Sequence, residues 1–230
     1  MMGPNNLGDI NDMLTLCEKL PEDITGNVIM DWTKSVAVTG FEGDNSTLSI
    51  LEELKKEGVE NRNLSFFEFD MSYKNVEEML PPIRMLDYKD FVLHLAHHNI
   101  QNTISLEQCA FTTGYTQPDK NGYVPKVEDS EVLKIETKVN CDELKTKLTE
   151  KLGLDGVKFG GLKIEKSQDS GRHAKVNFSR PIDAYLYQLS LQQDAWSTLL
   201  VKIPPFEGTC TKEAVAEVIR ELIKNVTSTF

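Results

Sequence analysis

Cysteine is scarce in this sequence, and the cysteines that it has form no pattern. The four of them are far apart, and no two stand in a CxxC pair: Cys17, Cys109, Cys141 and Cys210. Small secreted domains need a dense cysteine framework, which this spacing does not provide. The scarcity therefore excludes the disulfide-rich class and predicts a protein of the reducing cytoplasm.

Long hydrophobic runs are also lacking. The longest apolar runs, such as residues 91–96 and 198–203, have the length of a strand, whereas a membrane-spanning helix needs about 20 apolar residues. The first residues, MMGPNNLGDIND, show no basic segment followed by an apolar one. We therefore predict neither a transmembrane helix nor a secretion signal.

Positive charge is in deficit. Lys and Arg total 25 against 36 Asp and Glu, which gives a formal net charge of -11 and an isoelectric point near 4.9. A surface field of this sign repels phosphate backbones and anionic lipid head groups. Nucleic acid and membrane surfaces are therefore not expected as partners.

What remains is the composition of a folded domain, with 40% hydrophobic and 27% charged residues. Residues 1–33 are predicted to be a loosely ordered N-terminal appendage, because Gly, Pro, Asn and Asp interrupt each short apolar stretch; a short helix over residues 9–19 is conceivable there. Residues 34–230 are predicted to form one α/β domain, since the chain length suits a single core.

Strand-like and helix-like segments alternate through this domain. Ser49 and Glu52 have capping-box spacing before one helix, and Asn140 and Glu143 have it before another. Pro81 and Pro82 are expected to end a short helix, and Pro181 is expected at the first position of a later one. Strands are predicted at residues 36–39, 64–69, 91–96, 103–109, 157–165 and 198–203, with helices after Ser49, at 74–80, after Asn140, at 184–190 and at 211–225. The alternation predicts a mostly parallel sheet covered by helices on both faces.

Five segments in order resemble the pyroglutamyl-peptidase I family, whose members are cysteine peptidases that remove N-terminal pyroglutamate. The likeness covers about Ser35 to Ile223, and its segments are VAVTGFE from Val36, FEFDMSY from Phe67, LHLA with TISLEQC from Leu93, SQDSGR from Ser167, and LLVKIPP from Leu199. The resemblance implies a three-layer α/β/α fold with a mostly parallel twisted sheet, of the phosphorylase/hydrolase-like architecture. It also implies a cysteine nucleophile, a histidine proton shuttle and an acid that orients the histidine.

Only the acid of that triad is matched here. The acid position falls on Glu107, the histidine position on Lys202, and the cysteine position on Lys175 or, with a gap of one residue, on Val176. Neither of the last two can form a thiolate, and a lysine cation does not exchange a proton as imidazole does. The resemblance therefore implies a degenerate member, in which the opposite charges of Glu107 and Lys202 are expected to approach each other.

The substrate pocket implied by the resemblance is eroded as well. Phe41 corresponds to one of the two aromatic residues that hold the pyroglutamate ring, but the second is missing. Asp70 stands where the family has a proline and Met71 follows it; a carboxylate in an apolar pocket would disfavour a neutral lactam. We take Phe41, Asp70 and Met71 as the remnant of the pocket.

Three further groups of residues have both a functional and a structural interpretation. His94, His97 and His98 could bind a metal, but their spacing shares one face only on a helix, and this segment is predicted to be a strand; no metal and no cofactor are expected. Ser170 or Ser179 could replace the nucleophile, with Lys202 as an unusual base. Cys109 and Cys141 are interpreted as buried thiols.

Two functions follow from these residues. The first is a noncatalytic interaction or regulatory module, a pseudoenzyme whose partners are peptides or another protein. The alternative is an active or residual cysteine-type peptidase that removes N-terminal pyroglutamate, with Glu107 retained for chemistry.

Overall fold

The computed structural model describes residues 33–85, 90–126, 132–154, 159–167 and 181–227. The predicted appendage, residues 1–33, lies outside this set except for Thr33. The nucleophile segment with Lys175, Val176, Ser170 and Ser179 also lies outside it. No helix among the described residues is long and apolar enough to cross a bilayer.

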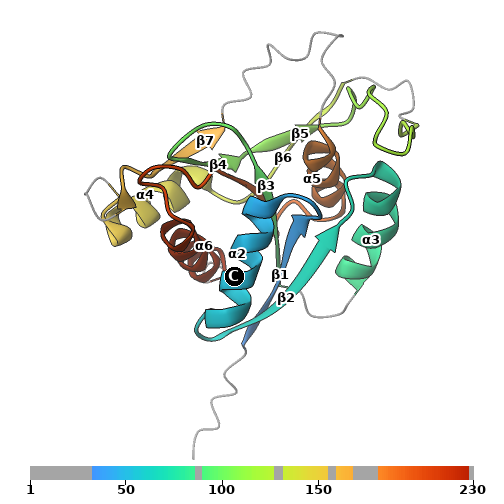
Figure 1. The fold of residues 1–230 in the computed structure, drawn as a ribbon. Coiled ribbons are helices and arrows are strands. Elements are labelled where there is room, and N and C mark those ends of the chain that lie inside the picture. The colour runs from blue at the N-terminus through green and yellow to red at the C-terminus, as the bar shows by residue number, and fades with distance from the viewer. Residues whose placement is uncertain (1–32, 86–89, 127–131, 155–158, 168–180, 228–230) are drawn as a thin grey trace, which may run out of the picture. The chain divides into compact units, whose positions relative to one another are not determined.

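A twisted sheet of six strands forms the middle layer (Figure 1). Its order is β2 (Arg62–Phe69), β1 (Lys34–Phe41), β3 (Phe91–His97), β8 (Thr198–Ile203), β4 (Thr103–Glu107) and β7 (Lys163–Ser167). The first four run parallel to one another, and β4 pairs with β8 in the antiparallel sense. The sheet is therefore mostly parallel, as predicted, with β4 and β7 reversed at one edge.

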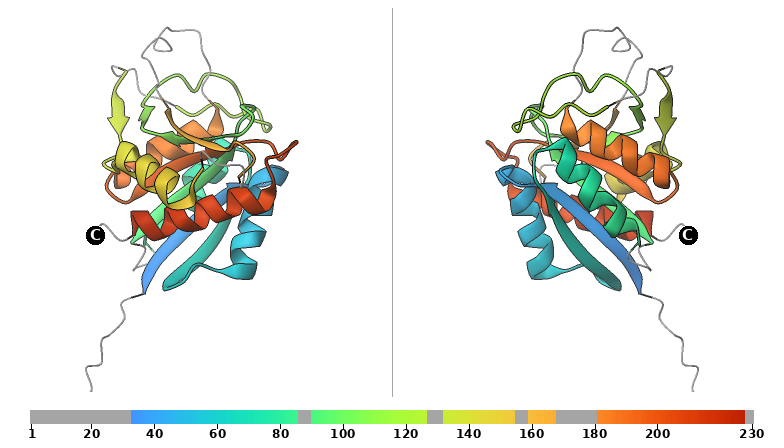
Figure 2. Two further views of the ribbon diagram at one scale, coloured as in Figure 1. Left: turned by 90° about the vertical axis from the view of Figure 1, so that its left-hand side faces the viewer. Right: turned by 90° about the vertical axis from the view of Figure 1, so that its right-hand side faces the viewer.

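Helices cover both faces of this sheet, which Figure 2 shows in turn. One face carries α2 (Asn45–Glu57), α4 (Cys141–Leu152) and α6 (Lys212–Val226), packed in a large aliphatic core. The other carries α3 (Tyr73–Met85) and α5 (Ile182–Gln193), with a small antiparallel pair of β5 (Cys109–Phe111) and β6 (Lys134–Glu136) beside them. Buried strands such as β3 are apolar on both faces because both are covered.

One of the two predicted helix N-caps is confirmed and the other is wrong. Asn140 caps α4 by accepting a hydrogen bond from the Glu143 amide at 3.1 Å, as its spacing indicated. The predicted cap at Ser49 is wrong, because α2 begins earlier and its cap is Asp44, which accepts from the amides of Ser46 and Thr47. Aspartate is as good an N-cap as serine, so Asp44 can fill this role in place of Ser49.

Three element boundaries also differ from the prediction. Helix α3 continues through Pro81 and Pro82 to Met85, because burial of Leu80 and Ile83 in the core offsets the hydrogen bonds that proline removes. Pro181 is the N-cap of α5 and not its first residue. Strand β7 begins only at Lys163, because the residues from 159 to 162 form a turn with positive φ at its two glycines.

Candidate functional site

The residues that matched the catalytic acid and histidine lie on adjacent strands. In the antiparallel register, Ser105 of β4 faces Lys202 of β8, and Glu107 faces Leu200. Since side chains two residues apart share a face, Glu107 and Lys202 are diagonal neighbours on the same face of the sheet. Both line one cavity of about 700 Å³, which we call the Lys202 cavity.

The ammonium of Lys202 pairs with a carboxylate that the sequence did not suggest. Its Nζ lies 3.1 Å from Oδ2 of Asp183, and the two side chains are only 22% and 13% exposed. Asp183 belongs to the first turn of α5, where the helix dipole favours a negative charge. Glu107 and Lys202 line the same cavity, and Lys202 forms an ion pair with Asp183; the expected close approach of Glu107 and Lys202 stays a prediction.

Glu107 is positioned through its backbone. Its carbonyl accepts a hydrogen bond of 2.7 Å from the hydroxyl of Tyr187, a side chain of α5 that is only 1% exposed. This bond ties the end of β4 to the helix that also carries Asp183. The acid position and the cation at the histidine position are thus held by the same helix.

The rest of the Lys202 cavity is polar. Lys166 and Asp142 form an ion pair of 2.6 Å on its wall, and Ser105 supplies a hydroxyl opposite Lys202. Other lining residues are His98, Ile100, Lys145, Glu165 and Ser167. Ser105 was missed by sequence reasoning because only the pairing of β4 with β8 places it beside Lys202.

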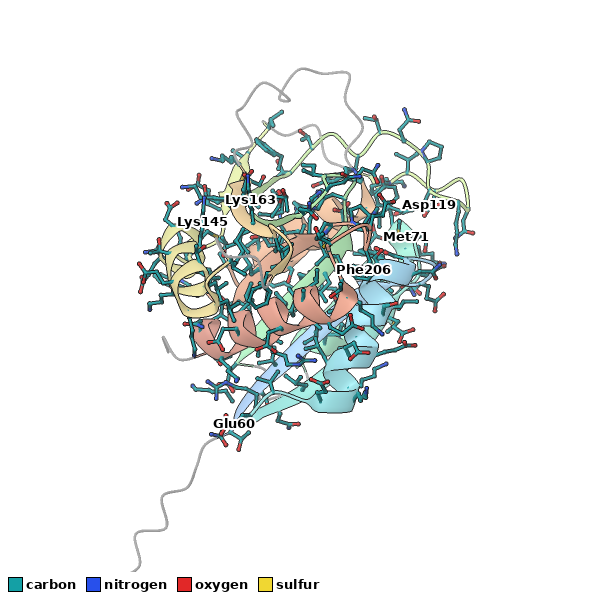
Figure 3. The ribbon with its side chains drawn as sticks, turned by 60° about the vertical axis from the view of Figure 1, so that its left-hand side comes forward. Glu60, Met71, Asp119, Lys145, Lys163 and Phe206 are labelled. Atoms are coloured by element: carbon teal, nitrogen blue, oxygen red, sulfur yellow. The ribbon has the colours of Figure 1, made fainter. Side chains whose placement is uncertain are left out.

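A second cavity of about 700 Å³, the Phe41 cavity, lies at the C-terminal ends of β1 and β3. Phe41 is 2% exposed and packs against Phe69 with ring centroids 6.1 Å apart. Met71 lines the same cavity and is 42% exposed. Figure 3 shows Met71 beside the N-terminal end of α2, well away from Lys145 on α4.

Asp70, the third residue of the predicted pocket remnant, is engaged elsewhere. Its carboxylate pairs with Lys120, and this hydrogen bond raises the pKa of the lysine. Its backbone amide donates to Oδ1 of Asn75 at 2.8 Å. The structure thus brings Phe41 and Met71 together at one cavity, while the Asp70 carboxylate is held by a cation.

The histidines have structural partners. The Nδ1 of buried His94 is hydrogen-bonded to Oγ1 of Thr39 at 2.8 Å. The ring of His98 accepts from the amide of Ile100 at Nδ1, so its Nε2 donates to the carbonyl of Thr103 at 2.8 Å, and burial lowers its pKa. Within the described ranges, no group of three metal-binding side chains is close enough to hold an ion.

The cysteines in the described part of the chain are buried: Cys109, Cys141 and Cys210. Burial raises the pKa of the Cys141 thiol to about 12, although this residue begins α4, and it also raises the pKa of Cys210. The thiolate is the nucleophilic form. These environments therefore suppress the reactive form of both thiols.

Known proteins resemble this chain in sequence. The family model for pyroglutamyl peptidase PgaPase_1 matches residues 13–207. The chain belongs to this pyroglutamyl peptidase family. Among curated proteins, the human and mouse pyroglutamyl-peptidase 1 are each 25% identical over 203 residues, covering 84% of this chain and 90% of theirs.

Solved members of the pyroglutamyl peptidase family share the fold. The pyrrolidone carboxyl peptidase of Fervidobacterium islandicum superposes with a TM-score of 0.65 at 21% identity, covering 85% of this chain and 99% of that enzyme. The enzyme from Thermococcus litoralis gives 0.64 at 17% identity, with coverage of 85% and 94%. At this level of identity the likeness shows the three-layer α/β/α fold.

Proposed function

We propose that this member of the pyroglutamyl peptidase family does not hydrolyse pyroglutamyl peptides and acts as a binding or regulatory module for peptides or another protein. The observation that carries the proposal is the ion pair of Lys202 with Asp183 at 3.1 Å. Lys202 occupies the position that the resemblance assigns to the proton shuttle. A paired ammonium has only donors and no lone pair, so it cannot accept the proton of a nucleophile.

The same ion pair argues against a serine hydrolase built on Ser105 and Lys202. The two residues face each other across the β4–β8 ladder, so their side chains lie on the same face of the sheet. A general base must be neutral before it can act, however, and the Asp183 carboxylate favours the ammonium form of Lys202. The pair therefore supports the binding function over an altered hydrolase.

The buried thiols support the proposal from another direction. Cys141 is near the Lys202 cavity, since Glu107 and Lys166 of its lining both act on the thiol electrostatically. Burial nevertheless raises the pKa of this thiol to about 12. At neutral pH a thiol of that kind is almost entirely protonated. Free thiols at Cys141 and Cys210 also support our proposal of a reducing, cytoplasmic location, which imaging of a tagged chain would test.

A fluorogenic pyroglutamyl-amide assay at high protein concentration tests the catalytic part. We expect release of the reporter at the rate of the buffer blank. Lys202→His alone and Val176→Cys or Lys175→Cys alone should also be inactive, because groups that act as a unit are strongly non-additive. The double variants, Lys202→His with either cysteine, are the informative gain-of-function test.

Reporter release well above the blank by the unmodified chain would overturn the proposal. If iodoacetamide then abolished that release, a cysteine would be the nucleophile and the peptidase alternative would stand. Release that persisted after alkylation but vanished in Ser105→Ala would instead indicate the serine arrangement.

A further inference from the structure

The Phe41 cavity combines apolar walls with an acidic rim. Its apolar surface comes from Phe41, Met71, Ala96 and Pro181. Its rim carries three carboxylates, Glu42, Asp44 and Asp183, and the polar residues Gly43, Asn45, Ser46 and His97 complete the lining. Histidine 97 is the one lining side chain in the described residues that could carry positive charge.

Two of the three carboxylates form no ion pair within the described residues. Asp183 is paired with Lys202, but neither Glu42 nor Asp44 forms an ion pair with any residue that the structure describes. Asp44 uses Oδ1 to cap α2, and Glu42 is exposed at the rim. Lys120 pairs with Asp70 and also acts electrostatically on Glu42, without an ion pair between them. Among the described residues that line the cavity, Glu42 and Asp44 therefore contribute negative charge that no ion pair neutralises.

We propose that the Phe41 cavity binds a protonated primary amine next to an apolar group, namely the free N-terminus of a peptide whose first side chain is apolar. This deepens the proposed function by naming the class of ligand, and it rests on that function because a bound peptide would not be cleaved. The Glu42 and Asp44 carboxylates receive the ammonium, and the side chain lies against Met71 and Phe41.

Charge complementarity selects this ligand over a pyroglutamyl peptide. The lactam of pyroglutamate is neutral and has a single N–H donor, so it offers two carboxylates one hydrogen bond and no opposite charge. An α-amino group is largely protonated below about pH 7.7 and can donate three hydrogen bonds. The preference is thus for N-termini that are unblocked.

Titration calorimetry with three matched peptides tests this proposal. They are leucyl-alanyl-alanine amide, its N-acetyl form, and pyroglutamyl-alanyl-alanine amide. We expect the free amine to bind about fivefold more tightly than either blocked peptide, since one charged contact at an exposed rim contributes up to about 1 kcal/mol.

Two matched substitutions test whether the carboxylate of Glu42 receives the ammonium of the peptide. Glu42→Gln should weaken binding of the free-amine peptide by about threefold to fivefold and leave the blocked peptides unchanged. Glu52→Gln, an exposed acid of α2 that does not line the cavity, is the control and should change neither. The ε-methyl NMR signal of Met71 should shift on addition of the free-amine peptide, which places the ligand against that wall.

Three outcomes overturn the inference: no binding of any peptide, equal affinity for free and acetylated termini, or a Glu42→Gln effect no larger than that of Glu52→Gln. Each of these leaves the proposed function standing if pyroglutamyl-amide is not hydrolysed. Hydrolysis of that substrate would instead refute the proposed function, whichever peptide binds better.

Discussion

Replacing Asp183 with asparagine removes the partner of Lys202 and leaves the ammonium in a largely buried setting. The two charged atoms are 3.1 Å apart, with side chains 13% and 22% exposed. At an effective dielectric constant of about 20 their attraction is about 5 kcal/mol, part of which is cancelled by the cost of desolvating both charges. We expect a net loss of about 2 kcal/mol in the free energy of unfolding for Asp183→Asn.

Urea unfolding followed by circular dichroism measures this loss, and thermal unfolding should show a decrease of about 4–8 °C in Tm for a domain of this size. Glu78→Gln is the matched control, since Glu78 pairs with Lys74 at 3.7 Å with side chains 64% and 71% exposed. An exposed pair of this kind contributes less than about 0.5 kcal/mol.

A double-mutant cycle with Lys202→Met separates the pair from other effects of either change. We expect a coupling free energy of about 1–2 kcal/mol between positions 183 and 202, because the double variant leaves no unpaired buried charge. A coupling near zero, or an Asp183→Asn loss no larger than that of Glu78→Gln, would refute the argument that this ion pair holds Lys202 as an ammonium.

Three other outcomes are expected. The Cys141 thiol, with a pKa raised by burial to about 12, should react with iodoacetamide at about pH 8 only as fast as the chain opens, which mass spectrometry of the alkylated protein would show. Partial burial lowers the pKa of His98, so the unfolded chain binds a proton at this residue first as the pH falls. Stability should therefore fall as the pH drops below about 6.5, by up to about 1.4 kcal/mol per pH unit, and less so in His98→Asn. Gly160→Ala should destabilise the fold strongly in urea unfolding, because φ is +60° and a Cβ would lie 2.3 Å from the Thr209 carbonyl oxygen. Gly161→Ala is the control: its φ is +78° and no atom lies within 4 Å of the added Cβ, so only about 1–2 kcal/mol of backbone strain is expected.

Local patterns in the sequence predict most of the strands and helices. The strand at residues 198–203 was predicted with the bounds that β8 has, and Asn140 was identified as the cap of α4. Both depend on neighbours along the chain, namely apolar periodicity and a side chain that reaches the amide three residues on. The family resemblance rested likewise on short segments in order, and the family model confirms it.

The site depended on contacts that no local pattern encodes. Asp183 meets Lys202 because the first turn of α5 packs beside β8, which places its Oδ2 3.1 Å from the lysine Nζ. Ser105 faces the same lysine because β4 runs antiparallel to β8. The sequence alone determined the fold class and the family, and the resemblance assigns Glu107 and Lys202 to the acid and histidine positions. Only the tertiary structure decided which charges meet, because pairing between distant segments is set by the packing of helices and strands and not by their order in the chain.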